Sequence, residues 1–505
     1  MNINIKFSKT APKSVDCLVA LVDSKKKIPD SLKALDKSLK GFIANALKEQ
    51  TSFEGNLKQF ATLALPKNAS AKHVILCGIG EAKDLDTLDA DNLGGKLYNT
   101  LEGLKIKSAA LYAETKKGLA LDLLAAHLAH GTKLGSYKFD KYRPSKKAKD
   151  KPSKITLTLI SDEAMKAKKL YSRLEAVESG VFLARDLVNE APNILYPESY
   201  AKIIKKELTP LGVKVEIFDH KKLEKMGMGA ILAVGQGSAR KPCMVIMSWN
   251  GSGKKMSKPL GFVGKGVTFD TGGISLKPGA GMDEMKLDMG GSAAVVGLMK
   301  SLATQKSKKD VVGIVGLAEN MPSSNAYRPG DIIESYNGKF IEVLNTDAEG
   351  RMVMADCLTY IQEKYDPSFV IDLATLTGAI IMALASEFSG VFVNNDKLWD
   401  KINTAGTETG EKVWRMPLDD FYRKNVESDI AAVRNLAKNG RWGGACTAAA
   451  FLESFIDEGR DWAHMDIAGT AMFGGSYGKA EFDLGPKGGT GVGVRLLERL
   501  VHDYK

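Results

Sequence analysis

Apolar residues follow two patterns along this chain, short unbroken runs and longer stretches in which apolar positions return every three or four residues. Unbroken runs are typical of strands buried on both faces, and the longer pattern is typical of amphipathic helices. The two patterns alternate from the N-terminus to the C-terminus. We therefore predict an α/β protein with a smaller N-terminal α/β domain and a larger C-terminal α/β domain, the latter with a mostly parallel, helix-covered sheet that carries the active site.

The N-terminal domain is predicted to comprise residues 1–165. Its expected strands are residues 14–22, 73–80 and 155–160, and its expected helices are residues 32–50 and 88–104. A long helical pattern follows at about residues 162–188 and ends at the breaker NEAPN. We predict that residues 166–190 form a helix linking the two domains and that residues 166–505 make up the C-terminal domain.

The C-terminal domain alternates in the same way. We expect strands at residues 231–237, 243–249, 260–269, 311–318, 340–345 and 369–376, and helices at residues 291–303 and 351–365. Functional residues of open α/β sheets lie in loops beyond the carboxyl ends of the strands. Asp270 and Asp347 each follow an expected strand at close range. The pattern therefore predicts that these two acids lie at an active site.

Charged residues are concentrated in the glycine-rich segments 262–291 and 345–351. We select as candidate site residues four acids and three bases in these segments: Lys265, Asp270, Lys277, Asp288, Asp347, Glu349 and Arg351. Buried charge is costly unless it is paired or bound to metal. Asp347 and Glu349 are two positions apart, and an extended backbone would place both carboxylates on one face. Carboxylates held this close share a proton or a cation, which predicts a pair of divalent ions that activate water.

The residues leave the metal open among zinc, manganese and magnesium. Lys265 could ligate an ion if its amine lost its proton, since lysine shifts its pKa readily on burial. Lys277 and Arg351 would then be free to stabilise developing negative charge. The alternative is an ion-pair network of loops without a metal.

Net charge is +11 and the sequence pI is about 9.1, with lysine-rich runs such as residues 141–154. We interpret these runs as solvated loops and keep nucleic-acid binding as an alternative, although no aromatic residues are interleaved with the bases. Five scattered cysteines without a CxxC spacing favour the reducing cytoplasm. The sequence shows no secretory signal and no uninterrupted apolar run long enough for a membrane span, so no membrane association is expected.

Several long motifs carry a family resemblance. The motifs GKGVTFDTGGISLKP, MKLDMGG, NTDAEGR, ATLTGA and WAHMDIAGTA occur in this order after ARDLVNEAPN. Together they resemble the leucyl (cytosol) aminopeptidase family of two-metal exopeptidases, over about residues 186–495. The N-terminal third is similar only in its domain pattern. The resemblance implies a metal-dependent aminopeptidase that removes N-terminal, preferably leucine-like, residues from peptides.

The resemblance also implies residue roles and partners. One Mn²⁺ or Zn²⁺ ion would be held by Lys265, Asp270, Asp288 and Glu349, and a second by Asp270, Asp347 and Glu349. Lys277 would polarise the peptide carbonyl, and Arg351 would hold a bicarbonate ion acting as general base. The apolar pocket for the first side chain would be lined by Met285, Thr375, Gly378, Ala468 and Ala471. A homohexamer is expected, with the N-terminal domain serving oligomerisation or regulation.

Overall fold

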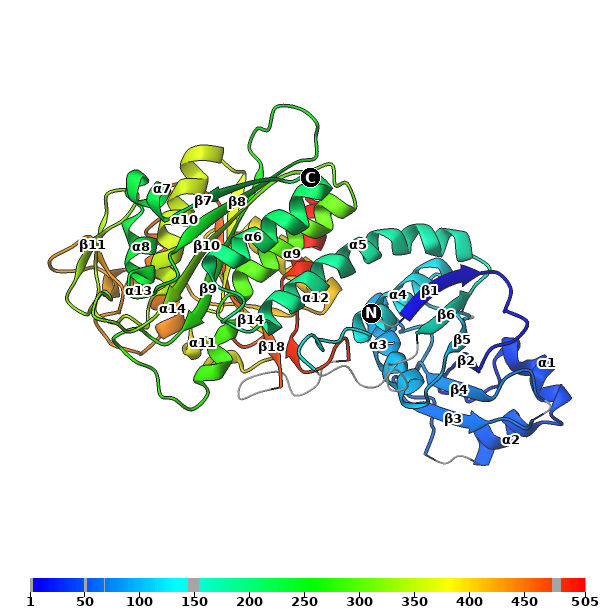
Figure 1. Cartoon of the computed structure of the whole chain (residues 1–505). Helices are drawn as coiled ribbons and strands as arrows, with labels where there is room; N and C mark the ends of the chain where they lie inside the picture. The colour runs from blue at the N-terminus through cyan, green and yellow to red at the C-terminus, as the bar shows by residue number, and fades with distance from the viewer. Residues whose placement is uncertain are drawn as a thin grey trace. The chain divides into compact units, whose positions relative to one another are not determined.

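The protein is described by a computed structural model over residues 3–49, 52–67, 69–115, 117–143, 154–474 and 483–504. Part of the lysine-rich run, residues 144–153, lies outside the described residues. The chain divides into two compact units, each with its own sheet (Figure 1). Unit 1 comprises Met1–Glu178 and Phe482–Pro486, and unit 2 comprises Ser179–Glu481 and Lys487–Lys505.

The sheet of unit 1 has the strand order β1-β6-β5-β2-β4-β3. Its strands are β1 (Ile3–Ser8), β2 (Cys17–Val22), β3 (Phe60–Ala64), β4 (His73–Gly78), β5 (Ser108–Tyr112) and β6 (Ile155–Ile160), and only the β3–β4 pair is antiparallel. Successive residues of β2 enter two different cores: Val19 packs with α3 (Thr87–Gly103) and α4 (Leu121–Gly135), whereas Leu18 packs with α1 (Asp30–Ser38) and α2 (Phe42–Glu49). Helices therefore cover both faces, as the unbroken apolar run of β2 predicts.

The single helix expected at residues 32–50 is wrong, because this segment forms α1 (Asp30–Ser38) and α2 (Phe42–Glu49). Lys40 and Gly41 between them have φ of 55° and 82°, in the left-handed region that ends a helix. The Asp36 carboxylate then accepts hydrogen bonds from the backbone amides of Ile43 (2.7 Å) and Ala44 (3.1 Å). These bonds satisfy free amides at the start of α2 and stabilise the break.

Helix α5 (Ala164–Asn189) is 26 residues long and contains the division between the units, after Glu178. Within the described residues, none of the helices combines the length and apolar character needed to cross a membrane.

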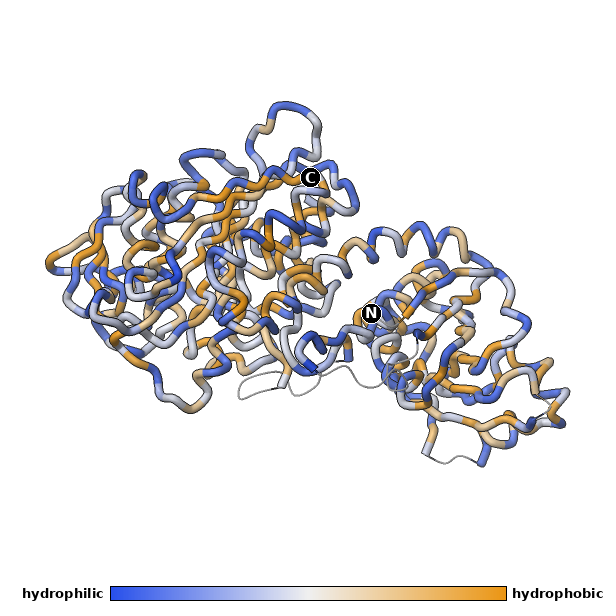
Figure 2. Tube along the Cα trace, viewed as in Figure 1, coloured by the Kyte–Doolittle hydropathy of each residue, from blue (hydrophilic) through white to orange (hydrophobic). Residues whose placement is uncertain are grey.

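The sheet of unit 2 has the order β15-β14-β17-β13-β9-β10-β8-β7. Its strands are β7 (Lys214–Phe218), β8 (Cys243–Asn250), β9 (Leu260–Asp270), β10 (Asp310–Asn320), β13 (Phe369–Ala374), β14 (Ser389–Val393), β15 (Val413–Arg415) and β17 (Trp462–Asp466). Strand β9 lies in the interior of the sheet and runs parallel to both neighbours, β10 and β13. The parallel pairs are β9–β10, β9–β13, β13–β17 and β14–β15, and the antiparallel pairs are β7–β8, β8–β10 and β14–β17. The prediction of a mostly parallel sheet is therefore confirmed. Figure 2 shows apolar segments along these strands.

Two helices approach the centre of this sheet closely through glycine positions. On β10, a side chain at Gly313 would meet Val295 of α9 (Gly290–Thr304), and one at Gly316 would meet Val353 of α10 (Gly350–Tyr365). These glycines are three apart along a strand, so α9 and α10 cover opposite faces. At the start of α9, a Cβ on Gly291 would lie 1.9 Å from the Leu373 carbonyl oxygen of β13. Helix α9 thus begins against the central strands.

Two expected strands of the C-terminal domain need correction. Residues 231–237 belong largely to α8 (Gly229–Gly235), whose Ile231 amide donates to the Asp356 carboxylate of α10 at 3.0 Å. A short apolar run does not separate a buried helix from a buried strand, and here the polar partner on α10 favours the helix. Residues 340–345 supply only β12 (Phe340–Glu342), which pairs with β11 (Ile332–Glu334) and β16 (Val433–Arg434) in a small separate sheet.

Candidate metal and peptide site

Asp270 is the last residue of β9 and lies opposite Asn320, the last residue of β10. Its Oδ1 atom accepts hydrogen bonds from the Asn320 side-chain amide and the Gly272 backbone amide, both at 2.8 Å. Gly272 has φ of 85°, and a Cβ there would lie 2.5 Å from the Ser275 carbonyl oxygen. The tight turn therefore requires glycine and fixes the orientation of the Asp270 carboxylate.

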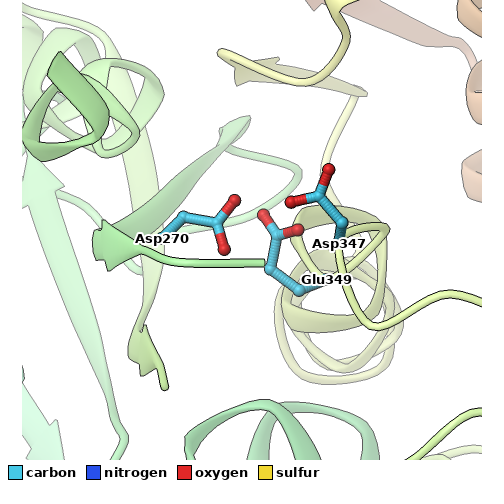
Figure 3. Close-up of side chains that lie close together, drawn as sticks. All are labelled: Asp270, Asp347 and Glu349. Atoms are coloured by element: carbon cyan, nitrogen blue, oxygen red, sulfur yellow. The ribbon is translucent and has the colours of Figure 1, made fainter. Parts of the chain in front are cut away.

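Asp347 and Glu349 come from the segment that leads into α10. The expectation of an extended backbone is wrong: Asp347 lies in a turn, and Glu349 has φ −83° and ψ −35° directly before the helix. Carboxylate oxygens of Asp270, Asp347 and Glu349 nevertheless all lie within 4.8 Å of one another. Figure 3 shows Asp270 reaching from its strand toward the two acids at the start of the helix. The helix N-terminus favours negative charge at this position.

Asp288 and Lys265 form a buried part of the same cluster. The Lys265 ammonium contacts Asp288 Oδ1 at 2.7 Å and Glu349 Oε1 at 2.9 Å, and it donates to the Thr375 carbonyl oxygen at 3.1 Å. Asp288 Oδ1 also accepts from the Thr375 hydroxyl at 2.9 Å, whereas its buried Oδ2 has no hydrogen-bond partner in the described part of the chain. A Cβ on Gly350 would lie 2.4 Å from Lys265 Cε, so glycine at the start of α10 makes room for the lysine.

Lys277 and Arg351 complete the charged set. The Lys277 ammonium contacts Asp270 Oδ2 at 2.8 Å and is also paired with Asp347 Oδ1. Each of the two lysines therefore joins two carboxylates. The Arg351 guanidinium is 8% exposed and donates from Nη1 to the Asn435 carbonyl oxygen at 2.9 Å. Its Nε has no hydrogen-bond partner in the described part of the chain, so it can still donate.

Burial dominates the electrostatics of the acids. It raises the pKa of Asp270 to about 6, with Glu349 adding to the effect and Lys277 opposing it. Burial also raises the pKa of Asp288 well above its usual value despite Lys265. Burial acts in the same sense on Glu349, but Lys265 and Lys277 outweigh it and lower the pKa of that carboxyl. Four acids with only two lysines among them thus form a site that further positive charge would stabilise.

The charged cluster opens into a cavity of about 680 Å³ that all seven of the charged residues line. Of the residues expected in the side-chain pocket, Met285, Thr375, Gly378 and Ala468 also line this cavity. Ala471 does not; it is buried, and its Cβ is 3.4 Å from the place where a Cβ on Gly290 would lie. The cavity is within the size range of sites for small molecules.

Several supporting residues are not evident from the sequence. Asn320 could have been found, because it follows an apolar strand just as Asp270 does. Asn435 carries no such signal, yet it is fully buried and its side chain bonds the Asn345 carbonyl oxygen at 2.7 Å. Asp466 ends β17 and accepts from the Thr377 hydroxyl at 2.7 Å and the Leu376 amide at 3.1 Å. It therefore holds the loop after β13 against the cavity.

The sequence and the fold were compared with known protein families and structures. Residues 182–498 match the model of the cytosol aminopeptidase family, catalytic domain, and residues 18–146 match that of the N-terminal domain of the same family. The chain belongs to the cytosol aminopeptidase family. It is 44% identical to a probable cytosol aminopeptidase of Wolbachia pipientis wMel over 504 residues, covering 99% of this chain and 96% of that protein. It is 46% identical to one from Afipia carboxidovorans over 496 residues, covering 98% and 96%.

Solved structures agree with the family assignment. A mutant of tomato leucine aminopeptidase superposes with a TM-score of 0.86 at 32% identity, covering 99% of this chain and 96% of the other. The bottromycin maturation enzyme BotP in complex with Mn superposes with a TM-score of 0.83 at 28% identity, covering 97% and 99%. The predicted family and two-domain α/β fold are confirmed, and the protein is a metal-dependent aminopeptidase acting on peptides. The comparisons give no support to the nucleic-acid alternative.

Proposed function

We propose that this aminopeptidase releases N-terminal residues, leucine-like ones preferentially, with two divalent ions, Mn²⁺ or Zn²⁺, held by the charged cluster. The observation that carries the proposal is the convergence of Asp270, Asp347 and Glu349 within 4.8 Å beside a cavity. Three carboxylates so close together need compensating charge, and two lysines supply only part of it.

The donor set suits divalent ions. The buried Asp288 Oδ2, which lacks a hydrogen-bond partner within the described residues, is available as a ligand. One ion would be held by Lys265, Asp270, Asp288 and Glu349, and the other by Asp270, Asp347 and Glu349. Lys265 can serve only as a neutral amine and must give up its proton to do so. Oxygen-rich ligation of this kind accepts either metal.

Ions bound here would polarise the peptide carbonyl and activate water. Lys277 would donate to the carbonyl oxygen as negative charge develops on it. Burial opposes the charged form of Lys277, but Asp270, Glu349 and Asp347 outweigh it and raise its pKa. At neutral pH the side chain is therefore an ammonium that donates a hydrogen bond rather than a base.

Arg351 would hold a bicarbonate ion that accepts a proton during the reaction. Burial lowers the pKa of Arg351 to about 10, which keeps the guanidinium charged at neutral pH. Its Nη1 is engaged with Asn435, while Nε remains able to donate to an anion.

Selection of the substrate would rest on charge and on size. A bound metal ion and the Asp288 carboxylate would together hold the free amine of the peptide, which would restrict cleavage to N-termini. Met285, Thr375, Gly378 and Ala468 would surround the first side chain. We retain Ala471 as a further pocket residue, acting from behind Gly290. The mixture of small and flexible apolar side chains suits a leucine-like group.

Removal of metal tests the cofactor. Dialysis against a chelator is expected to abolish hydrolysis of leucine amide, because the carboxylates alone cannot activate water, and added Mn²⁺ or Zn²⁺ should restore it. Metal content by elemental analysis should approach two ions per chain in the restored protein. Full activity in protein with no detectable metal would contradict the proposal.

The remaining proposals concern assembly and location. We assign residues 1–165 to an oligomerisation or regulatory domain and residues 166–505 to the catalytic domain, with 166–190 as the linking helix. The family resemblance supports a homohexamer, and the family name supports a cytoplasmic location. Light scattering on the purified protein should give six times the chain mass of 54.5 kDa. A monomeric mass would contradict the hexamer.

A further inference from the structure

One wall of the cavity is formed by the segment that joins Asn435 to α14 (Gly444–Glu453). Asn435 anchors its start: the side-chain oxygen accepts from the Leu344 amide at 2.8 Å, and the backbone carbonyl accepts from Arg351. Gly444 anchors its end, since a Cβ there would lie 3.2 Å from Ala379 Cβ of α11 (Gly378–Leu384). The segment is therefore fixed at both ends to elements that line the site.

Between these anchors the chain turns through Gly440 and Gly443, whose φ values are 69° and 61°. Arg441 lies in this turn, is exposed and lines the cavity. In the part of the chain that the structure describes, its guanidinium forms no ion pair or hydrogen bond. The nearby Lys438 differs, because it pairs with Asp429 at 2.9 Å and does not line the cavity. The turn thus directs one uncompensated cation to the site.

The other charges of the cavity show what this cation could bind. Lys265 and Lys277 are committed to the four acids, and the buried Arg351 is bonded to Asn435. A short peptide carries a positive amine at one end and a carboxylate at the other, at most about 7 Å apart along two residues. A cavity of about 680 Å³ has room for more than the first side chain. With the amine at the acids, a cation elsewhere in the same cavity would stabilise the carboxylate, and Arg441 lines that cavity.

We infer that Arg441 binds a carboxylate on the part of the substrate that leaves, and so favours short or acidic peptides. The inference rests on the proposed aminopeptidase function. Two sources present the same chemistry: the terminal carboxylate of a dipeptide, or the side chain of an acidic second residue. A guanidinium suits either one, since its paired donors match both carboxylate oxygens.

The test compares substrates that differ only in that carboxylate. Leu-Gly against Leu-Gly amide reports the terminal group, and Leu-Asp amide against Leu-Asn amide reports the side chain. In Arg441→Gln, the ratio of kcat/KM for the acidic to the neutral member should fall about tenfold for at least one pair, as expected for a lost charge-assisted hydrogen bond. Lys438→Gln, in the same segment, should leave both ratios unchanged. The wild-type ratios should also decrease with added salt.

The outcomes separate the inference from the function on which it rests. A fall confined to one pair identifies the source of the carboxylate. Wild-type protein that hydrolyses all four substrates, with both ratios unchanged in Arg441→Gln, would overturn the role of Arg441 alone. Metal-loaded wild-type protein that hydrolyses none of them would overturn the proposed function and, with it, this inference.

Discussion

Replacing Glu349 with glutamine is expected to lower kcat for leucine amide by about 10³-fold, which corresponds to roughly 4 kcal/mol of transition-state stabilisation. The Glu349 carboxylate lies within 4.8 Å of Asp270 and Asp347 and contacts Lys265 at 2.9 Å, so it belongs to both proposed ion sites. Glutamine has nearly the same shape but lacks the charge. Steady-state kinetics and elemental analysis should therefore show loss of activity together with loss of bound metal.

The matched control is Glu363→Gln, near the far end of the same helix. Glu363 is exposed and pairs with the neighbouring Lys364, away from the cavity. We expect this variant to retain wild-type kinetics and metal content. Activity and metal content that survive in Glu349→Gln would remove this carboxylate from the proposed ion sites.

The sequence predicts much of this fold because its main strands are buried on both faces. Strands β8, β9, β10 and β13 lie close to the expected ranges, since unbroken apolar runs flanked by glycine and polar residues define them. The errors occur where the deciding interaction is distant in sequence. The run that forms α8 has its polar partner, Asp356, more than a hundred residues away.

The candidate site likewise combines features that local sequence patterns predict with features that depend on contacts between distant segments. The carboxylates of Asp270 and Asp347 lie close together, but the strand-end rule does not explain why, because β12 belongs to the small sheet rather than to the central one. Their proximity depends on the turn before α10 and on the bond from Asn320 to the Thr346 carbonyl oxygen at 3.0 Å. Such contacts between distant segments are not encoded in local periodicity. Long motifs could indicate the family, but not the buried supports of its site.

Lys277→Gln is expected to lower kcat by about 10²- to 10³-fold, the usual cost of removing one donor from a developing oxyanion. Unlike Glu349, Lys277 is proposed to act on the substrate rather than to hold an ion. Its ammonium faces Asp270 and Asp347 and is 22% exposed at the cavity, where a peptide can reach it. Metal content in this variant should therefore stay at the wild-type level while kcat falls and KM changes little.

Measuring metal content and turnover separately distinguishes two explanations for a loss of activity in Lys277→Gln. Lysine also neutralises two carboxylates, so its removal could act by weakening the cluster instead. That explanation predicts altered metal content, whereas oxyanion stabilisation predicts a lower kcat at full metal occupancy, partly recovered in Lys277→Arg. Lys300→Gln, which breaks a pair with Glu207 outside the cavity, serves as the control and should behave as wild type. Unchanged kcat in Lys277→Gln at full metal occupancy would contradict the role of Lys277, because Lys265, the other ammonium among the described residues that line the cavity, is held by Asp288 and Glu349 and is almost fully buried.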